Sequence, residues 1–423
     1  MVGGETSYSL LLTLAPGAAR SWSGLSGPSG ETRLTDRPLM DALEAGAPLA
    51  YLLQVGTPRA GRDVRGVLDV LHRRNLLAWE LRDADGSAVV TLAPLVHDVP
   101  LVEPGAPAGG DLHLSRFALL RHVDGAWLLE SGRSLLGARL IDEAAAMVTG
   151  GEGPPELRQL LSAGGLLVDS DVDGPSRYWE FHDRYFASRS RRDVDPSGGT
   201  FRFAGEHAPE PFDGPPPHLA EVVRLPVSDP SDPGPDLWDV VERRRSHAEI
   251  PDTPVSLDAL GSLLWHTLRV KELRPRYPGQ ATSYDIALRP VPSGGGTHSI
   301  GLWLACRNVE GLEPGVWWYD PAQHALARVC DITESVHLGN TAPVFGYLLS
   351  RHARLAWKYE RIAHALALKD SGVILHALQL SATALGLTLC PVGSGPASVM
   401  LNAFGLDADD YVPVGEFWLA VAP

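Results

Sequence analysis

The chain lacks most of the features that mark secreted or metal-binding proteins. Its 423 residues include only three cysteines, Cys306, Cys330 and Cys390, and these form no CxxC pair or other close spacing. Such wide spacing argues against a disulfide framework and a thiolate zinc site, and it favours a reducing compartment. We therefore interpret the three thiols as core or near-core side chains.

Positive charge and long apolar runs are also scarce. Lys and Arg number 36 against 51 Asp and Glu, so the formal net charge is -15. Nucleic-acid binding needs a surplus of basic side chains, which argues against DNA or RNA as the main partner. The apolar run from Leu10 to Leu14 lacks a basic leader, and no stretch approaches the roughly 20 apolar residues that span a bilayer. We expect a cytoplasmic protein with no membrane partner.

What is present is an ordinary globular composition, 44% hydrophobic and 21% charged, in a chain long enough for two or three domains. Two N-terminal segments combine helices with short hairpins, which is the winged-helix pattern. The first, residues 1–105, has a predicted helix over 62–74 and strands over 76–81 and 88–92.

The second segment, residues 106–175, has a predicted hairpin over 117–130 and helices over 141–148 and 156–163. Winged helices often bind DNA, but they also bind peptides through strand addition, and the acidic composition favours peptide docking or a scaffold role. Residues 176–235 follow as an aromatic connecting helix and a Pro-rich linker, which is the clearest domain boundary.

The last domain, residues 236–423, contains the patterns with chemical meaning. A predicted helix over 237–245 ends in the run Arg243-Arg244-Arg245-Ser246. Guanidinium groups can bind two phosphate oxygens, although an isolated arginine run is also typical of a solvated surface. The run Pro292–Thr297 contains three consecutive glycines before a predicted strand over 300–306. Such glycines let the backbone approach a flat ring or a phosphate, and they also form ordinary hairpin loops.

Further strands are predicted over 316–320 and 326–329. The long helix predicted over 363–385 is apolar nearly all round, so we expect it at the centre of the domain. Gly386 ends this helix, and a short helix over 397–404 lies near the end of the chain.

In this order the motifs resemble those of the nitroreductase superfamily, specifically the SagB-type dehydrogenases, which oxidise thiazoline and oxazoline rings in ribosomally made peptides. Four stretches carry the resemblance, and each alone is a weak signal. They are Arg244-Arg245-Ser246, Pro292-Ser293-Gly294-Gly295-Gly296, Gly315 to Asp320, and Tyr359-Glu360-Arg361 with Ala384 to Leu387. The resemblance extends from about Phe117 to the C-terminus. It implies an α+β fold with an antiparallel-rich C-terminal sheet flanked by helices.

The resemblance also implies FMN as cofactor and a homodimer with both active sites at the subunit interface. The matched cofactor positions are Arg244 and Ser246 with Arg245 between them for the phosphate, Ser293, Gly294 and Gly295 beside the ribityl chain and flavin ring, and Gly393 and Ser394 in the loop that closes over the flavin. The family's basic residue two positions after Ser246 is Ala248 here. Phosphate binding would then depend more on Arg244 and Arg245, or on an arginine of the partner subunit.

Lys358 and Tyr359 match the Lys-Tyr pair of the azoline dehydrogenases. Azoline oxidation removes a proton from the ring carbon next to the carbonyl and a hydride from the neighbouring carbon, so a base is needed. Free Lys and Tyr are mostly protonated at neutral pH, and burial or a neighbouring charge must activate one of them. We assign Tyr359 as the base and Lys358 as its tuner or a carbonyl-orienting donor, and the reverse assignment stays open. Without the resemblance, the pair would be interpreted as an ordinary helix start.

The leading hypothesis is thus an FMN-dependent azoline dehydrogenase that acts on a precursor peptide, with oxygen reoxidising the flavin. A cyclodehydratase complex is a further candidate partner. Two alternatives stay open: a nicotinamide-dependent nitro- or ene-reductase of small molecules, and a peptide-docking subunit without flavin, which Ala248 favours. We predict structural or solvated roles for His298, His364 and His376 and no metal site, because no second ligand stands at metal-binding spacing.

Overall fold

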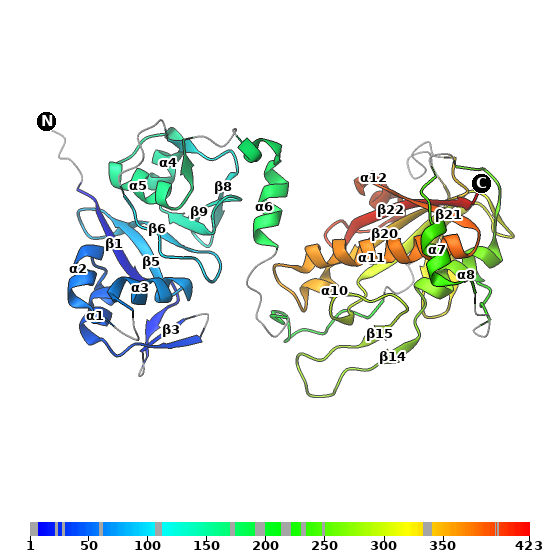
Figure 1. Ribbon diagram of the computed structural model, residues 1–423, viewed down its shortest axis with the longest axis horizontal. Coiled ribbons are helices and arrows are strands. Elements are labelled where there is room, and N and C mark those ends of the chain that lie inside the picture. The colour runs from blue at the N-terminus through cyan, green and yellow to red at the C-terminus, as the bar shows by residue number, and fades with distance from the viewer. Residues whose placement is uncertain are drawn as a thin grey trace. The chain divides into compact units, whose positions relative to one another are not determined.

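The computed structural model describes residues 7–21, 24–27, 30–58, 62–105, 112–169, 174–190, 199–212, 221–229, 234–247, 250–332, 341–393, 395 and 397–423. The chain divides into two compact units, Met1–Asp193 and Val194–Pro423, and each has its own hydrophobic core (Figure 1). Within the described ranges, no helix is long and apolar enough to cross a membrane.

The first unit consists of short strands and helices. Its strands are β1 (Ser9–Leu14), β2 (Ala19–Arg20), β3 (Gly24–Gly27), β4 (Gly30–Arg33), β5 (Leu77–Arg82), β6 (Ala88–Pro94), β7 (His113–Leu114), β8 (Ala118–Val123), β9 (Ala126–Ser131), β10 (Leu136–Leu140) and β11 (Leu167–Val168). Its helices are α1 (Arg37–Ala45), α2 (Leu49–Val55), α3 (Val64–Arg73), α4 (Asp142–Gly150), α5 (Pro155–Ala163), the short η1 (Gly174–Tyr178) and α6 (Phe181–Arg189).

A six-stranded antiparallel sheet organises the first unit, with the strand order β1-β5-β6-β10-β9-β8. The strands predicted over 76–81 and 88–92 are β5 and β6, and the hairpin predicted over 117–130 is formed by β8 and β9. One sheet therefore contains strands from both sides of residue 105. The winged-helix assignment of the two segments stays a prediction.

The second unit has longer elements. Its strands are β12 (Val222–Arg224), β13 (Val255–Ser256), β14 (Glu272–Arg274), β15 (Ile286–Leu288), β16 (Ile300–Cys306), β17 (Val309–Glu310), β18 (Gly315–Asp320), β19 (Ala325–Cys330), β20 (Val344–Arg351), β21 (Leu387–Val392) and β22 (Tyr411–Val421). Its helices are α7 (Leu237–Arg243), α8 (Leu257–Thr267), the short η2 (Gly294–Gly296), α10 (His352–Ala356), α11 (Ala363–Ala384) and α12 (Ala397–Phe404).

A seven-stranded antiparallel sheet forms the centre of this unit, in the order β12-β19-β18-β16-β20-β22-β21. Successive side chains of a strand point to opposite faces, so Leu302 and Trp303 of β16 belong to different cores. One core includes residues of α8 and α11, and the other includes residues of α12. Figure 1 shows α11 as the long helix that crosses the sheet. The predicted α+β domain with an antiparallel-rich sheet flanked by helices is confirmed.

Several local predictions are also confirmed. The strand predicted over 300–306 is β16, and the helix predicted over 363–385 is α11. Ser256 caps α8, because its hydroxyl accepts a hydrogen bond from the Ala259 N–H at 3.1 Å. Helix α7 ends at Arg243, two residues before the predicted end.

Part of the predicted linker belongs to the second unit. Strand β12 pairs with β19 and forms one edge of the seven-stranded sheet. Further upstream, the Phe201 N–H donates a hydrogen bond to the Lys358 carbonyl at 3.1 Å. Trp357 donates its indole N–H to the Glu206 carbonyl at 3.3 Å. Residues 199–212 therefore pack against the connection between α10 and α11.

Candidate functional site

Lys358 lies in the connection between α10 and α11, where three aromatic rings surround its ammonium group. Its Nζ is 4.9 Å from the ring centre of Tyr284, 5.2 Å from that of Tyr359 and 5.7 Å from that of Phe201. The Nζ also donates a hydrogen bond to the Tyr284 hydroxyl at 2.6 Å. Aromatic faces attract a cation, so the enclosure holds the ammonium in a fixed position.

The glycine-rich loop lies directly against this lysine and its neighbour. Gly295 in η2 has a φ of +63°, in the left-handed region. A Cβ atom at Gly295 would lie 2.4 Å from the Tyr359 hydroxyl and 2.6 Å from Lys358 Nζ. Only glycine tolerates both this conformation and this approach. The structure thus brings predicted residues from two distant motifs together around one point.

Tyr284 connects the loop to the lysine. Its hydroxyl donates a hydrogen bond to the Gly295 carbonyl at 2.6 Å and lies 2.6 Å from Lys358 Nζ. A phenol has a single hydrogen, so with that hydrogen on Gly295 the lysine must be the donor to Tyr284. The Tyr284 hydroxyl therefore fixes the position of the Lys358 ammonium.

The Tyr359 hydroxyl has a different environment. The side chain is buried, with 7% of its surface exposed, yet within the described part of the chain its hydroxyl has no hydrogen-bond partner. The hydroxyl oxygen itself is not fully buried. The Tyr359 hydroxyl is therefore available to a ligand, beside the ammonium of Lys358.

Helix α11 holds the loop from the other side through Asp370. Both carboxylate oxygens of Asp370 lie 3.0 Å from the Gly294 N–H, which donates to them. Burial raises the pKa of this carboxyl to about 6, and the hydrogen bond from Gly294 acts in the opposite direction. Leu366, one turn earlier on α11, also contacts Gly294. The helix thus fixes the loop that faces Tyr359.

Arg354 on α10 ties three segments around the site. Its buried guanidinium donates hydrogen bonds to the carbonyls of Thr297, Pro209 and Asp285, the first at 3.0 Å. Burial lowers the pKa of Arg354 to about 10, so the group stays charged at neutral pH. Its guanidinium carbon also lies 5.2 Å from the ring centre of Tyr284. One side chain therefore positions the glycine loop, the β14–β15 hairpin and the upstream segment.

Ser293 and the histidines shape the surroundings. The Ser293 hydroxyl accepts a hydrogen bond from the His298 N–H at 2.7 Å. Burial, together with the charges of Arg289 and Arg354, lowers the pKa of His298 to about 3, so this ring is neutral. Burial also lowers the pKa of His364. Among the residues that the structure describes, no group of three His, Cys, Asp or Glu side chains is arranged to hold a metal.

The predicted phosphate-binding run follows the end of α7. Arg243 pairs with Asp239 at 2.8 Å. Arg244 donates to the Ser246 hydroxyl at 3.4 Å, and Arg245 donates to two backbone carbonyls at 2.7 and 2.8 Å. Over the described ranges, neither Arg244 nor Arg245 pairs with a carboxylate. Their positive charge is therefore not neutralised locally.

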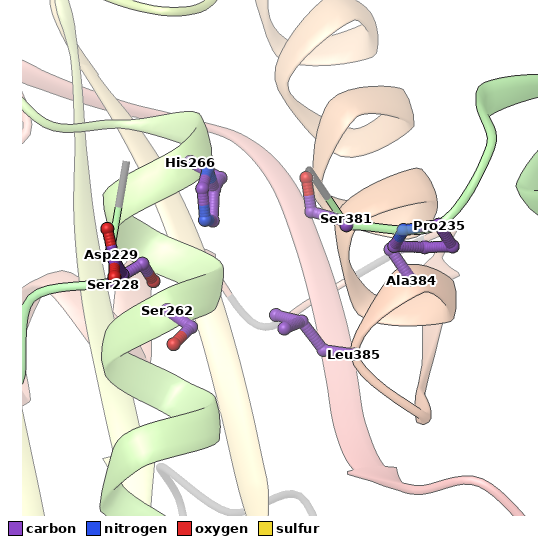
Figure 2. Close-up of a pocket in the computed structure, with 9 residues that line it drawn as sticks. Ser228, Asp229, Pro235, Ser262, His266, Ser381, Ala384 and Leu385 are labelled. Atoms are coloured by element: carbon purple, nitrogen blue, oxygen red, sulfur yellow. The ribbon is translucent and has the colours of Figure 1, made fainter. Parts of the chain in front are cut away.

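Within one chain this arginine run is separate from the Lys358 group, which consists of Lys358, Tyr359, Tyr284 and Gly295. Pro235, just before α7, lines a pocket of about 470 Å³ together with Ser381 and Ala384 near the C-terminal end of α11 (Figure 2). Asp370, which contacts the glycine loop, lies roughly 16 Å earlier along the same helix. No hydrogen bond or ion pair between described residues joins the two groups. None of the predicted site residues lines the pocket in Figure 2.

The second glycine-rich stretch follows β21. Gly393 is exposed, whereas Ser394 and Ala248 lie outside the described residues. A Cβ atom at Gly395 would lie 2.8 Å from a carboxylate oxygen of Glu416. Burial raises the pKa of Glu416. This stretch therefore passes close over a buried carboxyl group.

Comparison with known proteins gives a family for the second unit. Residues 241–421 match the model of the nitroreductase family. A curated protein of Methanocaldococcus jannaschii, named as a nitroreductase, is 26% identical over 167 residues, which are 37% of this chain and 78% of that protein. The C-terminal region therefore contains a nitroreductase-family domain, and members of this family are typically FMN-dependent oxidoreductases.

Two solved structures are also similar to this chain. One is a nitroreductase-type protein of Anabaena variabilis, with 14% identity and a TM-score of 0.44 over 97% of this chain and 86% of that chain. The other is the microcin synthetase McbBCD complex of E. coli with truncated pro-MccB17 bound, with 18% identity and a TM-score of 0.37 over 56% of this chain and 86% of that chain. Both scores are low, so the assignment rests on the family match.

Proposed function

We propose that the protein is an FMN-dependent dehydrogenase that oxidises thiazoline or oxazoline rings to thiazoles or oxazoles in a ribosomally made peptide. The observation that carries this proposal is the unpartnered hydroxyl of the largely buried Tyr359 side chain, beside the Lys358 ammonium and Gly295. Proton removal from an azoline needs a base close to a charge that stabilises it, at a place where a flat ring can approach. A nitroreductase-family domain supports the flavin chemistry.

The donor groups present fit FMN. Arg244 and Arg245 have guanidinium groups without carboxylate partners in the described ranges, and Ser246 adds an exposed hydroxyl, which together suit a phosphate. Gly294 and Gly295 allow the backbone to approach a flat ring. Gly393 and Ser394 stay proposed contacts of the flavin. When bound, FMN supplies the acceptor for the hydride that leaves the azoline.

The separation of the two groups within one chain leads us to propose a homodimer. One subunit would supply the phosphate-binding run, and the other would supply the glycine loop with Lys358 and Tyr359. Helix α7 supports a subunit contact at this place, because Leu237, Trp238 and Val241 expose 57%, 73% and 40% of their surfaces. Exposed apolar patches of this kind typically mark an interface.

Tyr359 is the proposed base. Its phenolate takes the proton from the ring carbon next to the carbonyl, and the adjacent Lys358 ammonium stabilises the negative charge of that phenolate. Tyr284 holds Lys358 in place through the hydrogen bond at 2.6 Å. This arrangement favours Tyr359 over Lys358 as the base, because Lys358 already acts as a donor and Tyr359 has a free hydroxyl.

The first unit is a second candidate place for the peptide to bind. Strand β8 lies at one edge of the six-stranded sheet, and an extended peptide can add to such an edge. We propose that this unit docks the precursor peptide, alone or with a cyclodehydratase complex. The nitroreductase-family match, by contrast, covers only residues 241–421.

A second candidate function is a nicotinamide-dependent reductase of nitro or ene compounds. The curated relative from Methanocaldococcus jannaschii, which is named as a nitroreductase, favours it. Such an enzyme has no use for a base that takes a proton from a peptide ring. It would therefore keep its activity on a nitroarene when Tyr359 is replaced by Phe, because solvent can supply the protons of that reduction.

The test combines a spectrum with a product mass. Purified protein with flavin absorbance is mixed in air with a thiazoline peptide, and we expect the peptide to lose two hydrogens per ring. Tyr359→Phe should bind the same amount of flavin and leave the peptide unchanged. An unchanged peptide with the wild-type protein, together with turnover of NADPH and a nitroarene, would instead establish the reductase. A colourless protein that takes up no FMN would contradict both enzymes and favour a docking subunit.

A further inference from the structure

A groove with a volume of about 610 Å³ lies beside the Lys358 group and has no role in the mechanism above. One wall is the turn between β14 and β15, which includes Arg276, Tyr277 and Gln280, and the other includes Glu206. Trp357 completes the lining. All of these residues belong to the second unit.

The walls of the groove are held together by hydrogen bonds. Arg276 lies 2.8 Å from His207 Nδ1 across the groove, with the guanidinium as donor, and Trp357 donates to the Glu206 carbonyl at 3.3 Å. Within the turn, the Tyr277 N–H donates to the Ser283 hydroxyl at 2.6 Å. The groove is therefore formed before any ligand arrives, which lowers the cost of binding one.

The groove shares a wall with the three aromatic rings that surround the Lys358 ammonium. The Trp357 ring packs edge-on against the rings of Tyr284 and Phe201, with both pairs of ring centres 5.7 Å apart. Those two rings also face the Lys358 ammonium. Ser283 lines the groove, and the next residue, Tyr284, turns inward to Lys358. The groove therefore adjoins the aromatic rings that enclose Lys358.

The lining suits a peptide better than a compact small molecule. Small ligands usually occupy enclosed and mostly apolar pockets, whereas this groove is open and lined by polar and apolar surface in about equal shares. Glu206 and Arg276 have opposite charges, and Gln280 adds an amide that can both donate and accept. Tyr277 exposes 70% of its surface and offers a flat ring for packing. An extended peptide has one donor and one acceptor at nearly every residue and matches such a surface.

We propose that this groove binds the uncharged, extended stretch of peptide next to the azoline ring, and this inference rests on the proposed function. The groove would then select substrates by the residues that flank the ring. The docking proposed for the first unit would act on another part of the same peptide.

The test measures peptide binding and turnover separately, with the full-length protein loaded with FMN. The probe is a fluorescein-labelled synthetic peptide in which glycine and serine flank one thiazoline. Tyr277→Ala should weaken binding about tenfold, as loss of a well-packed aromatic contact does, whereas Tyr277→Phe should bind like the wild type. Gln280→Ala should weaken binding, and Gln323→Ala, the same change in the exposed turn between β18 and β19, should not.

Turnover supplies the second arm of the test. We expect Tyr277→Ala to raise KM for the peptide at unchanged kcat, and to oxidise a lone thiazoline carboxamide at the wild-type rate. If fluorescence anisotropy shows that Tyr277→Ala and Gln280→Ala both bind the labelled peptide as tightly as the wild type, the groove proposal is overturned. Equal losses of turnover with the peptide and with the lone ring would also overturn it. If the wild type oxidises neither compound, the proposed function fails, and the anisotropy series still decides whether the groove binds peptide.

Discussion

Gly295 and Gly311 both adopt the left-handed region, with φ of +63° and +78°, but only Gly295 has neighbours where a Cβ would stand. Gly295→Ala should lower kcat for an azoline peptide by about a hundredfold, because the new methyl displaces the Tyr359 hydroxyl and Lys358 Nζ. Gly311→Ala meets no atom within 4 Å and should lose only about 1 kcal/mol of stability. Turnover and urea unfolding of both variants measure this contrast, and equal kcat losses would contradict it.

Tyr284 contributes through its hydroxyl, so Tyr284→Phe removes the hydrogen bond to Lys358 and keeps the aromatic ring. We expect the same flavin content and a kcat lower by about tenfold or more, since hydrogen bonds to charged groups contribute about 1.5–3 kcal/mol. Tyr51→Phe, an exposed tyrosine in the first unit, is the control. A kcat equal to that of the wild type would exclude this role.

At the scale of elements, helix α11 and the glycine loop meet at Asp370, and this contact makes stability depend on pH. Burial raises the pKa of Asp370 from its ordinary 3.8 to about 6, so the folded protein holds the proton between these values. The stability that this proton provides is present below about pH 4 and is lost as the pH rises through about 6.

Asp370→Asn keeps an acceptor for Gly294 and removes the charge. The difference in free energy of unfolding between Asp370→Asn and the wild type should therefore grow in favour of the variant by about 1–2 kcal/mol from pH 4 to pH 7. This value includes an allowance for solvent screening. Urea unfolding at several pH values measures the difference. Asp409→Asn, at an exposed position, should follow the wild type throughout. If the free energy of unfolding depends on pH in the same way for Asp370→Asn and the wild type, the buried charge has no such effect.

The elements themselves could be predicted because their signals are local. The long apolar stretch of α11 and the short apolar run of β16 each lie within one segment of sequence, and both elements have nearly the predicted bounds. Of the site, Gly295, Lys358 and Tyr359 could be found because they stand in recognisable motifs. Ala248 and Ser394 lie outside the described residues, so their predicted roles stay predictions.

The remaining site residues act through contacts between distant parts of the chain. Tyr284 and Lys358 are 74 residues apart, and Arg354 binds the carbonyl of Pro209 across 145 residues. Phe201 lies in a Pro-rich linker, and nothing in its neighbourhood marks it as part of a site. Asp370 had a local signal, since a carboxyl in a helix that is apolar nearly all round must be buried or paired.

At the scale of the whole molecule, the proposed dimer predicts that two inactive variants restore each other. Arg244→Ala/Arg245→Ala lacks the proposed phosphate site, and Tyr359→Phe lacks the proposed base. If one site takes the arginines from one subunit and Tyr359 from the other, each mixed dimer contains one intact site and one with both defects. Denaturing and refolding an equal mixture should therefore give about one quarter of wild-type activity, since half the dimers are mixed.

The controls for this mixing experiment are the two variants refolded alone, which should be inactive. A mixture that stays inactive, although labelled subunits are shown to exchange, would place the arginines and Tyr359 of each site in the same chain. A monomer in solution at all protein concentrations would also contradict the shared site.

Side chains of the turn between β14 and β15 point in two directions, and this has an evolutionary consequence. Tyr284 points inward to Lys358, whereas Tyr277 is exposed along the groove. Mutations around Tyr277 can accumulate without moving the atoms that react, because Arg354 anchors the hairpin through the Asp285 carbonyl. If the groove binds peptide as proposed, a lineage of such proteins would diverge toward new peptides through this turn alone, while the proposed chemistry at Tyr359 stayed the same.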